Sequence, residues 1–324
     1  MALTPVTNIY IGNYKFKGCK SFEVDKDVNN LSVTGRVELP LRAMLSGEKG
    51  KEKILVGDTI NQGDTIKIEA GYKELELYIL FEGFITNIDP SDSIKIEIED
   101  SVYLLRKHPV IIDKKDTTVK EVCDLLLPPG KGLTVNSSTI NAKIDVFKWN
   151  GNAAGALARL KETMSLTCYF DGTELYAGGQ QMNIKGQVNV TYGENILRNQ
   201  ASYQYAETNP VQVTVIGKKE NGEEVKVIDG QEGGSTMTFY KYNVTDKAAL
   251  TTMAKEELAK YSFDGFKGSV KLWFIPFVEP GGSAVFKNKN YKQDAEGKYF
   301  IEAVKYSFSS GDGLKQDVKL GAKL

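Results

Sequence analysis

The chain has 324 residues and a formal net charge of −1 at pH 7, from 41 Lys and Arg against 42 Asp and Glu. At roughly 100–150 residues per domain this length predicts two or three cores, and the balanced charge argues against a general nucleic-acid coat or a polybasic membrane binder. The 31 Gly, 16 Tyr and 14 Phe favour β structure over helical bundles.

Cysteine and histidine are scarce. The three cysteines, Cys19, Cys123 and Cys168, include no C-x-x-C pair, and with one histidine, His108, no zinc cluster is expected. We therefore expect buried, reduced thiols in a protein assembled inside a cell. The N-terminus lacks a basic region followed by an apolar run, and no window approaches the roughly 20 apolar residues of a membrane-spanning helix. These features predict a soluble product that is not exported by the usual route and does not insert into a membrane.

Residues 1–105 are predicted to form a first β-barrel. Strand patterns fill residues 6–39 and again residues 63–100, where polar and apolar residues alternate with the period of two that is typical of strands. The three strands within 63–100 are expected to pair as antiparallel neighbours. The apolar positions predicted to alternate on their inner faces are Ile66 and Ile68, then Leu75, Leu77, Ile79 and Phe81, and then Ile94, Ile96 and Ile98.

Residues 40–56 break this alternation with an apolar patch followed by a charged run, L-R-A-M-L-S-G-E-K-G-K-E-K. This pattern predicts a long loop, with a helical turn at residues 41–45. An apolar loop that lacks a core of its own is a candidate for contact with a partner. The alternative, that it folds back over the end of the barrel, stays open.

Residues 106–185 predict a small α+β insert of order β-α-β-α-β-β. A first short helix is expected after a cap at Asp116 or Thr117, and a second over Ala153–Met164. Asp171-Gly172 predicts a tight hairpin between the last two strands. The helix positions expected to be buried are Val119, Val122, Cys123 and Leu126 in the first helix, and Ala156, Leu157, Leu160 and Met164 in the second.

Residues 186–324 predict a second β-barrel region that one helix, at about 245–261, interrupts. Asn221-Gly222 marks a hairpin. Thr245 is expected to cap the helix, whose buried face is expected to hold Leu250, Met253, Ala254 and Leu258. The last strands, V-E-P-G-G-S-A-V-F, Y-F-I-E-A-V-K-Y-S-F and L-K-Q-D-V-K-L, repeat in order the pattern of residues 63–100. Two related barrels fit this repeat, and so do two unrelated β meanders.

Motifs that carry chemistry are sparse. No G-x-x-x-x-G-K-[ST] loop is present, and a Ser-His-Asp or Cys-His arrangement would need the single His108, for which we expect a structural role. Asp89, Asp92, Glu99 and Asp100 cluster in sequence and are candidates for a carboxylate pair or a calcium site. They flank turns and strand ends, however, where acids are commonly solvated. We therefore predict no catalytic, cofactor-binding or metal-binding residue.

Aromatic residues give a second candidate surface. Such side chains stack on sugars or bases in some proteins, and form cross-strand pairs within sheets in many more, which is the role expected here. The residues concerned are Tyr203, Tyr205, Phe239, Tyr240 and Tyr242.

Charge is unevenly distributed along the chain. Residues 63–100 hold ten acids against three lysines, a net charge of −7, and residues 241–324 hold fourteen lysines against ten acids, a net charge of +4. Solvated strand faces account for such a distribution in most proteins. Complementary contact between subunits is the alternative.

Several stretches resemble the phage baseplate hub proteins, the late-control-D-like tail proteins. G-D-T-I-K-I-E-A-G-Y, L-F-E-G-F-I-T-N-I and I-E-I-E-D-S-V-Y-L-L are similar to the first barrel of that family. The helix at 245–261, with V-E-P-G-G-S-A-V-F, G-K-Y-F-I-E-A-V-K-Y-S-F and S-G-D-G-L-K-Q-D-V-K-L, resembles the second. The resemblance implies a mainly β fold with an α+β insert, that is, two tube-protein-like β-barrels plus a small β-α-β-α-β-β domain. Type VI secretion spike proteins carry a similar hub but continue into a long needle, so a separate spike protein is implied here.

The resemblance also implies a structural role without enzymatic activity. It predicts a homotrimer that joins a hexameric tail tube to a trimeric spike. The expected partners are further copies of the chain, the tail tube protein, the spike protein and other baseplate proteins, with DNA passing non-specifically through the lumen. The expected location is the baseplate of the virion, assembled in the host cytoplasm. We further hypothesise that part of the acidic face of residues 63–100 lines the lumen and repels DNA. A tail-associated cell-wall-degrading enzyme and a carbohydrate-binding β protein are the alternatives.

Overall fold

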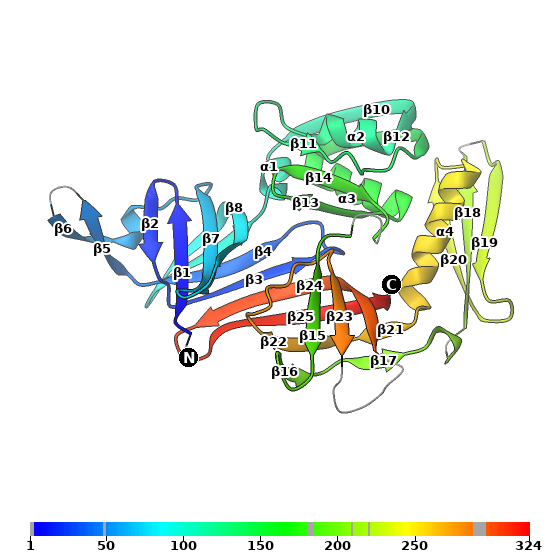
Figure 1. Cartoon of the computed structure of the whole chain (residues 1–324). Helices are drawn as coiled ribbons and strands as arrows, with labels where there is room; N and C mark the ends of the chain where they lie inside the picture. Colours follow the sequence, from blue (N-terminus) through cyan, green and yellow to red (C-terminus); the bar gives the residue numbers. More distant parts are fainter. Residues whose placement is uncertain (1–2, 48–49, 181–183, 209, 220, 288–295) are drawn as a thin grey trace.

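Strands dominate the computed structural model of the chain, which describes residues 3–47, 50–180, 184–208, 210–219, 221–287 and 296–324 (Figure 1). The first elements in chain order are β1 (Pro5–Ile11), β2 (Tyr14–Lys17), β3 (Ser21–Asp27), β4 (Thr34–Leu39), β5 (Arg42–Gly47), β6 (Gly50–Leu55), β7 (Thr65–Tyr72), β8 (Leu77–Pro90), β9 (Ile94–Glu99) and α1 (Val102–Arg106). The insert follows with β10 (Pro109–Thr118), α2 (Val119–Leu126), β11 (Thr134–Val135), β12 (Lys143–Asn152), α3 (Ala153–Met164), β13 (Thr167–Asp171) and β14 (Glu174–Gly178).

The rest of the chain returns to strands, with one long helix. Its elements are β15 (Gln187–Thr191), β16 (Ile196–Asn199), β17 (Ser202–Gln204), β18 (Val211–Lys218), β19 (Glu224–Gly230), β20 (Ser235–Tyr242), α4 (Lys247–Tyr261), β21 (Gly265–Lys267), β22 (Ser269–Trp273), β23 (Ser283–Lys287), β24 (Gly297–Ser309) and β25 (Gly313–Lys323). The predicted mainly β fold with an α+β insert is confirmed.

One large sheet runs through both ends of the chain. Its order is β16-β22-β25-β24-β3-β4-β9-β8-β7-β1-β2, with β15, β17, β21 and β23 attached beside this path. At its centre β3 pairs antiparallel with β24, from Ser21 opposite Ser309 to Asp27 opposite Ala303. We call this β3–β24 ladder the seam. Hydrogen bonds across the seam join the first half of the chain to the second, and each half contains one copy of the repeated sequence pattern.

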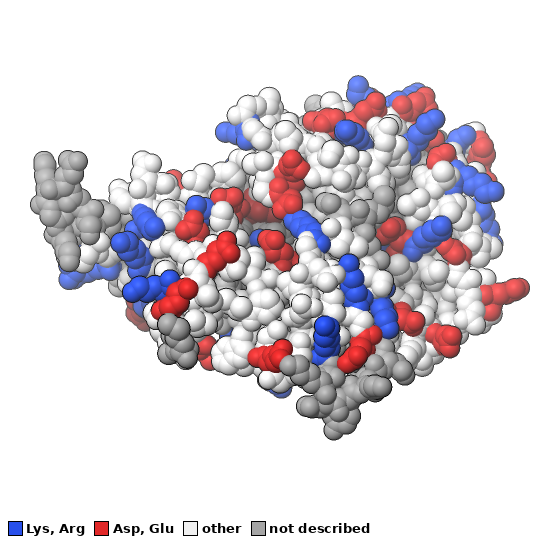
Figure 2. Space-filling view, viewed as in Figure 1, with Lys and Arg blue, Asp and Glu red and all other residues white. Residues whose placement is uncertain are grey.

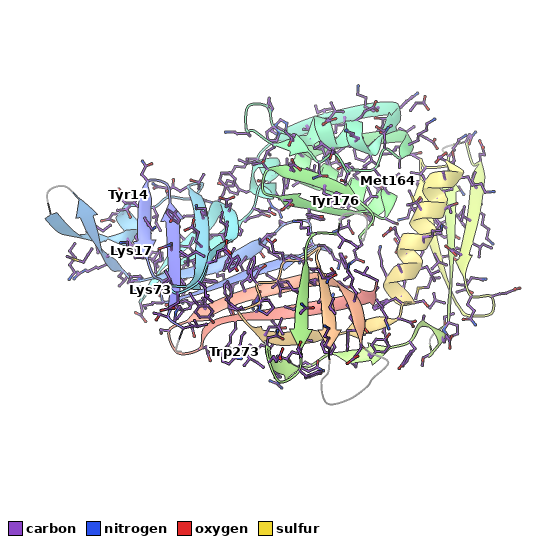
Figure 3. The ribbon with its side chains drawn as sticks, in the orientation of Figure 1. Tyr14, Lys17, Lys73, Met164, Tyr176 and Trp273 are labelled. Atoms are coloured by element: carbon purple, nitrogen blue, oxygen red, sulfur yellow. The ribbon has the colours of Figure 1, made fainter. Side chains whose placement is uncertain are left out.

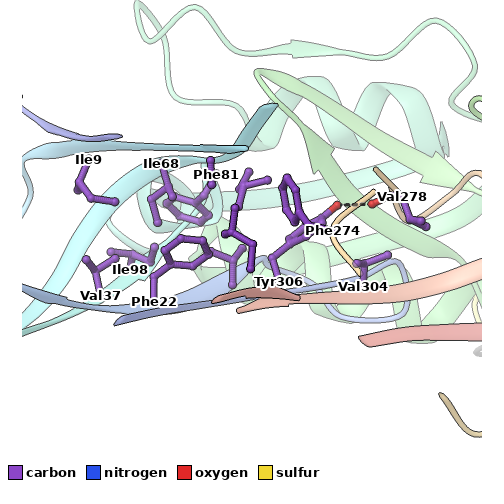
Figure 4. Close-up of a cluster of buried hydrophobic side chains, with 14 of the residues drawn as sticks. Ile9, Phe22, Val37, Ile68, Phe81, Ile98, Phe274, Val278, Val304 and Tyr306 are labelled. Carbon is purple, nitrogen blue, oxygen red and sulfur yellow. Dashed lines mark hydrogen bonds between the residues drawn. The ribbon is translucent and has the colours of Figure 1, made fainter. Parts of the chain in front are cut away.

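A single hydrophobic cluster extends across the seam. Alternate residues of each strand point into it, as the period of two requires, so that Phe22 and Val37 of the first half lie in one core with Phe274 of the second (Figure 4). Tyr306 is fully buried there, and its hydroxyl donates a hydrogen bond of 2.6 Å to the carbonyl oxygen of Val278. The polar end of this tyrosine is therefore satisfied within the core.

Each half contains an antiparallel meander built around a long central strand. The first is β7-β8-β9, centred on the 14-residue β8, and the second is β23-β24-β25, centred on the 13-residue β24. β-Bulges interrupt the pairing of both central strands, which bends such strands and increases their twist. The repeated sequence pattern thus corresponds to two similar arrangements of strands.

The α+β insert packs around a second hydrophobic cluster, to which β18 and α4 also contribute. The predicted range of α3 is confirmed, and Met164 at its end lies in this cluster (Figure 3). The predicted buried faces of α2 and α3 are also confirmed. Within the insert β10 pairs with β12, and β14 lies between β11 and β13. The predicted Asp171-Gly172 turn joins β13 to β14, with Gly172 at a φ of +59°, which favours glycine.

The cap of α2 differs from the prediction. Thr118, and not Asp116 or Thr117, is the capping residue: its hydroxyl accepts a hydrogen bond from the backbone N–H of Glu121, whose carboxylate accepts one from the backbone N–H of Thr118. This reciprocal pair is a capping box. The hydroxyl of Thr117 instead donates to the Glu121 carboxylate at 2.8 Å.

The cap of α4 also differs from the prediction. The side chain of Asp246 accepts a hydrogen bond of 2.8 Å from the backbone N–H of Ala249, whereas the hydroxyl of the predicted cap, Thr245, donates to Asp145. The helix packs against β18 and β19 of the small sheet β19-β18-β20. No helix in the described residues is long and apolar enough to cross a membrane.

Candidate functional surfaces

A polar, hollowed face lies over the seam. Strands β3, β4, β9 and β24 contribute to two adjoining hollows of about 580 and 470 Å³. Seven acids and six bases line them: Glu23, Asp25, Glu38, Asp89, Glu97, Glu99 and Asp312, with Arg36, Lys95, Arg106, Lys271, Lys305 and Lys315. Opposite charges meet across the strands, since Lys305 Nζ lies 2.9 Å from Glu23 Oε2 and Arg36 Nη2 lies 3.5 Å from Glu97 Oε1. This face is strongly polar but nearly neutral in net charge.

The acids of residues 63–100 do not gather on a single face. Asp89 and Glu97 line the hollows over the seam, whereas Glu69 of β7 is bound by Lys67 at 2.7 Å and by the Tyr10 hydroxyl at 2.9 Å. On the face of the molecule seen in Figure 2, acidic and basic side chains are interspersed. The net charge of this segment is therefore spread over several surfaces.

Two of the four candidate catalytic acids are buried, contrary to the expectation that these acids are solvated. Glu99 is held by the guanidinium of Arg106, whose Nη2 and Nε lie 2.7 and 2.9 Å from Glu99 Oε1. Asp100 accepts hydrogen bonds from the backbone N–H groups of Val33 and Val102, at 2.8 and 3.0 Å. Both carboxylates connect neighbouring segments of the chain, which is a structural role.

The other two candidate acids, Asp89 and Asp92, lie at the end of β8 and just after it. Asp89 and Asp92 are exposed, as expected. Asp89 lies opposite Lys95 on β9. Lys95 is four residues from Glu99, so Asp89 and Glu99 are separated by about 13 Å along the strands. The carboxylates of glycosidases are roughly 5–10 Å apart. Among the described residues, no group of three His, Cys, Asp or Glu side chains is placed to hold a metal ion.

His108 and the cysteines take structural positions. The carbonyl oxygen of His108 accepts a hydrogen bond of 2.8 Å from the backbone N–H of Ala153, the first residue of α3. Cys123 and Cys168 are buried free thiols, as expected, and Cys19 is half-buried. Burial raises the pKa of Cys19 to about 11, so its thiol is poorly reactive at neutral pH.

A cavity of about 280 Å³ lies where the first half, the insert and the second half of the chain meet. Lys26 of β3 lines it from an inward-facing position, because Phe22 and Val24 of the same alternating set are buried in the core. The ammonium group lies 5.8 Å from the centre of the Tyr306 ring, and burial lowers the pKa of Lys26. The alternation F-E-V-D-K-D-V already indicates that Lys26 faces inward with Phe22 and Val24, but Lys26 was not among the residues predicted from the sequence.

Charges from all three parts of the chain surround this cavity. Lys185 Nζ lies 2.7 Å from the carboxylate of Asp171 on β13, and Glu279 of the second half also lines the cavity. Asp100 also lines the cavity, and burial raises its pKa to about 7, against the effect of its two backbone donors. The cavity is a polar junction that connects the insert to the sheet.

An apolar stripe lies exposed on β8 and the turn before it. It consists of Leu75, Leu77 and Ile79, which are 53%, 39% and 49% exposed. The prediction that these residues share the inner face with Phe81 is wrong. A bulge at Leu80 reverses the alternation, since Ile68 pairs with Phe81 but the next residue of β7, Glu69, pairs with Ile79. The core therefore takes Leu80 and Phe81, and the stripe faces outward.

Residues 40–56 form a β-hairpin and not the predicted loop with a helical turn. β5 and β6 pair from Arg42 opposite Leu55 to Gly47 opposite Gly50. They form a two-stranded sheet of their own, which stands apart at the far left of Figure 1. The predicted candidate for partner contact is thus a hairpin arm.

The candidate aromatic surface divides into packed and exposed members. Tyr203 packs in edge contacts with Tyr205 and Phe266, as expected of cross-strand aromatics. Tyr240 and Tyr242 are exposed on β20. The five residues do not form one aromatic platform.

No protein-family profile matches the chain, and no curated protein sequence matches it. Solved structures do match, along nearly its whole length. The tail protein from Neisseria meningitidis superimposes with a TM-score of 0.70 at 14% identity, over 98% of this chain and 96% of that one. The chain has the fold of phage tail proteins.

Two further structures share this fold. The 43 kDa tail protein of prophage MuSo2 from Shewanella oneidensis gives a TM-score of 0.69 at 14% identity, over 98% of both chains. The E. coli c3393 protein gives 0.62 at 9% identity, over 98% of this chain and 77% of that one. It is described as a component of the type VI secretion system with structural similarity to the T4 tail proteins gp27 and gp5.

Proposed function

We propose that the chain is the structural hub of a phage-tail baseplate or of a related injection apparatus. The observation that carries this proposal is the full-length likeness in fold to two phage tail proteins, with TM-scores of 0.70 and 0.69. The likeness to a type VI secretion component supports the wider class of injection machines. The function lies in surfaces and symmetry, and the proposal includes no catalytic step.

The proposed assembly is a homotrimer. Each chain carries two similar meanders on either side of the seam, so three copies would present six similar units to a hexameric tail tube and three identical faces to a trimeric spike. The proposed partners are the tail tube protein, the spike protein and other baseplate proteins. The proposed location is the virion baseplate, after assembly in the host cytoplasm.

We place the lumen of this ring on the hollowed face over the seam. Asp89, Lys95, Glu97 and Glu99 would be the charged residues that residues 63–100 contribute to the lumen. Because bases balance acids on this face, passing DNA would meet no extended positive surface to which its phosphates could bind. DNA would then pass without sequence-specific contact.

The test combines solution mass with imaging. The purified chain is measured by light scattering alone, and again after addition of the tail tube and spike proteins encoded with it, and the particles are imaged by electron microscopy. A three-fold ring in the partner-added sample is the expected result. A chain that stays monomeric in both samples would overturn the proposal, and release of soluble fragments from peptidoglycan would favour the enzyme instead.

A further inference from the structure

The small sheet β19-β18-β20 ends in a free edge at β20 (Figure 1). At one end of this strand Ser235 donates its backbone N–H to the carbonyl oxygen of Pro210, and beyond the other end Asn243 donates to that of Lys218, at 2.9 Å in both cases. Backbone groups of successive strand residues point to opposite sides, so the odd-numbered residues of β20 face β18. The even-numbered ones, from Thr236 to Tyr242, point their N–H and carbonyl groups away from the sheet, and no described residue forms a hydrogen bond with these groups.

A groove of about 740 Å³ borders this edge. Its walls come from three parts of the chain: residues 239–242 of β20, the C-terminal part of α3 with its end at Ser165, and the β3–β4 turn at residues 29–31. β20 contains no proline, and its register with β18 has no bulge. Prolines and bulges are common means by which proteins protect such edges. The edge is therefore open to a further strand.

Positive charge is in excess in this groove. Four bases line it against two acids: Arg159, Lys161, Lys241 and Lys260, with Glu162 and Glu257. Glu257 is shared, because Lys260 Nζ lies 3.0 Å and Lys241 Nζ 3.9 Å from its carboxylate oxygens, and the hydroxyl of Ser165 donates to it at 2.6 Å. One acid thus faces two of the lysines.

The other two bases are weakly compensated. The ammonium group of Lys161 donates to the carbonyl oxygen of Asn29, which carries no charge. Arg159 lies 3.7 Å from Glu162 on the exposed surface of α3, and such a pair contributes little. Burial lowers the pKa of Lys161 and of Lys241, so carboxylates brought into the groove would stabilise the charged form of both.

The two sides of β20 present different chemistry to a strand beside it. Phe239 and Lys241 share one side, where Phe239 packs against the cluster of the insert and Lys241 Nζ donates to the carbonyl oxygen of Glu162 at 2.7 Å. Tyr240 and Tyr242 occupy the other side, 58% and 56% exposed. Because cross-strand neighbours share a side, acidic residues of an added strand would lie next to Lys241, and apolar residues next to the tyrosines.

We propose that the free edge of β20 binds an extended segment of another protein, in which acidic and apolar residues alternate. The segment extends the sheet β19-β18-β20 by one strand. Its backbone bonds to the outward groups of β20 supply affinity, and its alternating side chains supply specificity. This docking groove is separate from the hollowed face over the seam and does not depend on the proposed ring.

Fluorescence anisotropy with labelled peptides tests the proposal on the whole chain. The probe is a short peptide in which Val and Glu alternate, and the matched peptide carries Lys in place of every Glu. The acidic peptide is expected to bind at least about tenfold more tightly, because its carboxylates meet an excess of bases. Equal affinities of the two peptides, or no saturable binding of either, would overturn the proposal.

Methylation of the peptide backbone separates strand pairing from charge attraction alone. In a strand beside β20, alternate N–H groups point towards the edge. Methylation of one alternate set of peptide nitrogens should therefore abolish binding, and methylation of the other set should preserve it. Equal effects of the two sets would show that the peptide does not pair with the edge.

A Tyr240→Pro substitution blocks the edge in the protein itself. The N–H of Tyr240 points away from β18, so proline removes no hydrogen bond of the small sheet, and its ring covers the edge. Binding of the acidic peptide should fall about tenfold or more relative to Tyr240→Ala, which keeps the N–H. Far-ultraviolet circular dichroism checks that both variants fold. Equal binding by two folded variants would contradict pairing at this edge.

Charge reversal tests the groove without altering the edge. Arg159→Glu should weaken binding of the acidic peptide about fivefold or more. The matched control is Lys120→Glu, which makes the same change in net charge at an exposed position of α2 outside the groove, and it should leave binding nearly unchanged. Equal effects of the two substitutions would show a general attraction and overturn the site.

The outcomes separate this groove from the proposed hub. A three-fold ring together with a failure of the acidic peptide to bind overturns the groove and leaves the hub intact. Edge-specific peptide binding by a chain that forms no ring supports the groove and contradicts the hub. A peptide that dissociates a dimer of the chain, as seen by light scattering, shows a second copy at the edge and overturns the proposal of a different partner.

Discussion

At the scale of single residues, Gln316 shows how one buried amide fixes the path of a segment. Its side chain is fully buried on β25. Its amide nitrogen donates to the carbonyl oxygens of Trp273 and Pro276 at 2.9 and 2.8 Å, and its oxygen accepts from the backbone N–H of Val278 at 2.9 Å. One side chain thus satisfies three backbone groups at the end of β22 and in the segment that follows it.

Replacing this amide by an apolar group should therefore be costly. In Gln316→Leu those three backbone groups lose their partner, at about 1–3 kcal/mol for each buried polar group left unpaired. We expect the free energy of unfolding, measured with urea, to fall by about 3–5 kcal/mol. Lys315→Ala, which removes a surface ion pair with Asp312, should cost less than about 1 kcal/mol. Equal losses in the two variants would contradict the role assigned to Gln316.

Asp100 should make stability depend on pH. The pKa of Asp100 is raised by burial from 3.8 to about 7 in the folded chain, so folding favours the protonated form. Its contribution to stability is complete below about pH 4 and is lost as the pH rises through about 7, by up to about 4 kcal/mol at 1.4 kcal/mol per pKa unit. Urea unfolding from pH 4 to 8 should show this decline in the native chain and not in Asp100→Asn. Parallel curves for the two proteins would contradict it.

Residue-scale errors in the sequence analysis have a common cause. The alternation predicted correctly that Ile66, Ile68 and Ile96 are buried, because it needs no knowledge of neighbouring strands. It wrongly placed Ile79 in the core, because alternation alone does not reveal the bulge at Leu80. That bulge depends on how β8 pairs with β7. Burial of Glu99 and Asp100 likewise depends on Arg106 and on the backbone at Val33, which alternation does not report.

At the scale of elements, the capping box of α2 joins a helix to the end of a strand. Thr118 ends β10, where it pairs with Lys143 of β12, and its hydroxyl caps the helix that follows. We expect Thr118→Ala to lower the free energy of unfolding by about 1 kcal/mol. Lys120→Ala, at an exposed position of the same helix, should be near neutral because alanine favours the helix. A loss in Lys120→Ala as large as that in Thr118→Ala would show that the effect is not due to the cap.

Periodicity predicted helices better than it predicted their ends. The buried face of α2 and both ends of α3 follow from spacing within the segment. The caps lie one or two residues from their predicted positions, because the end of the preceding strand is set by pairing with distant residues. The arm β5–β6 was not predicted, because its Leu, Met and Ala residues favour a helical turn as much as a strand.

At the scale of the whole molecule, the seam makes the two halves depend on each other. The repeat in the sequence predicted two similar units, but the pairing of β3 with β24 brings together opposite ends of the chain and leaves no local signal. The extent of the common sheet and core was therefore beyond prediction from the sequence.

Removal of one half should therefore destabilise the other. A fragment of residues 1–105 would leave an open edge at β3 and would expose Phe22 and Val24, which the second half helps to cover. We expect this fragment to associate or to remain partly unfolded, as measured by light scattering and amide hydrogen exchange, under conditions where the whole chain unfolds in a single transition. A monomeric, cooperatively folded fragment would contradict this expectation.

The geometry of the seam has a mechanical consequence. In an antiparallel ladder the hydrogen bonds lie perpendicular to the strands, and the seam joins β3 to β24 through seven consecutive residue pairs. Tension that pulls the two strands apart along their length loads all of these bonds in shear at once, whereas tension across the ladder would open them one after another from an end. The proposed hub would therefore bear load best when the force on its two halves runs along β3 and β24.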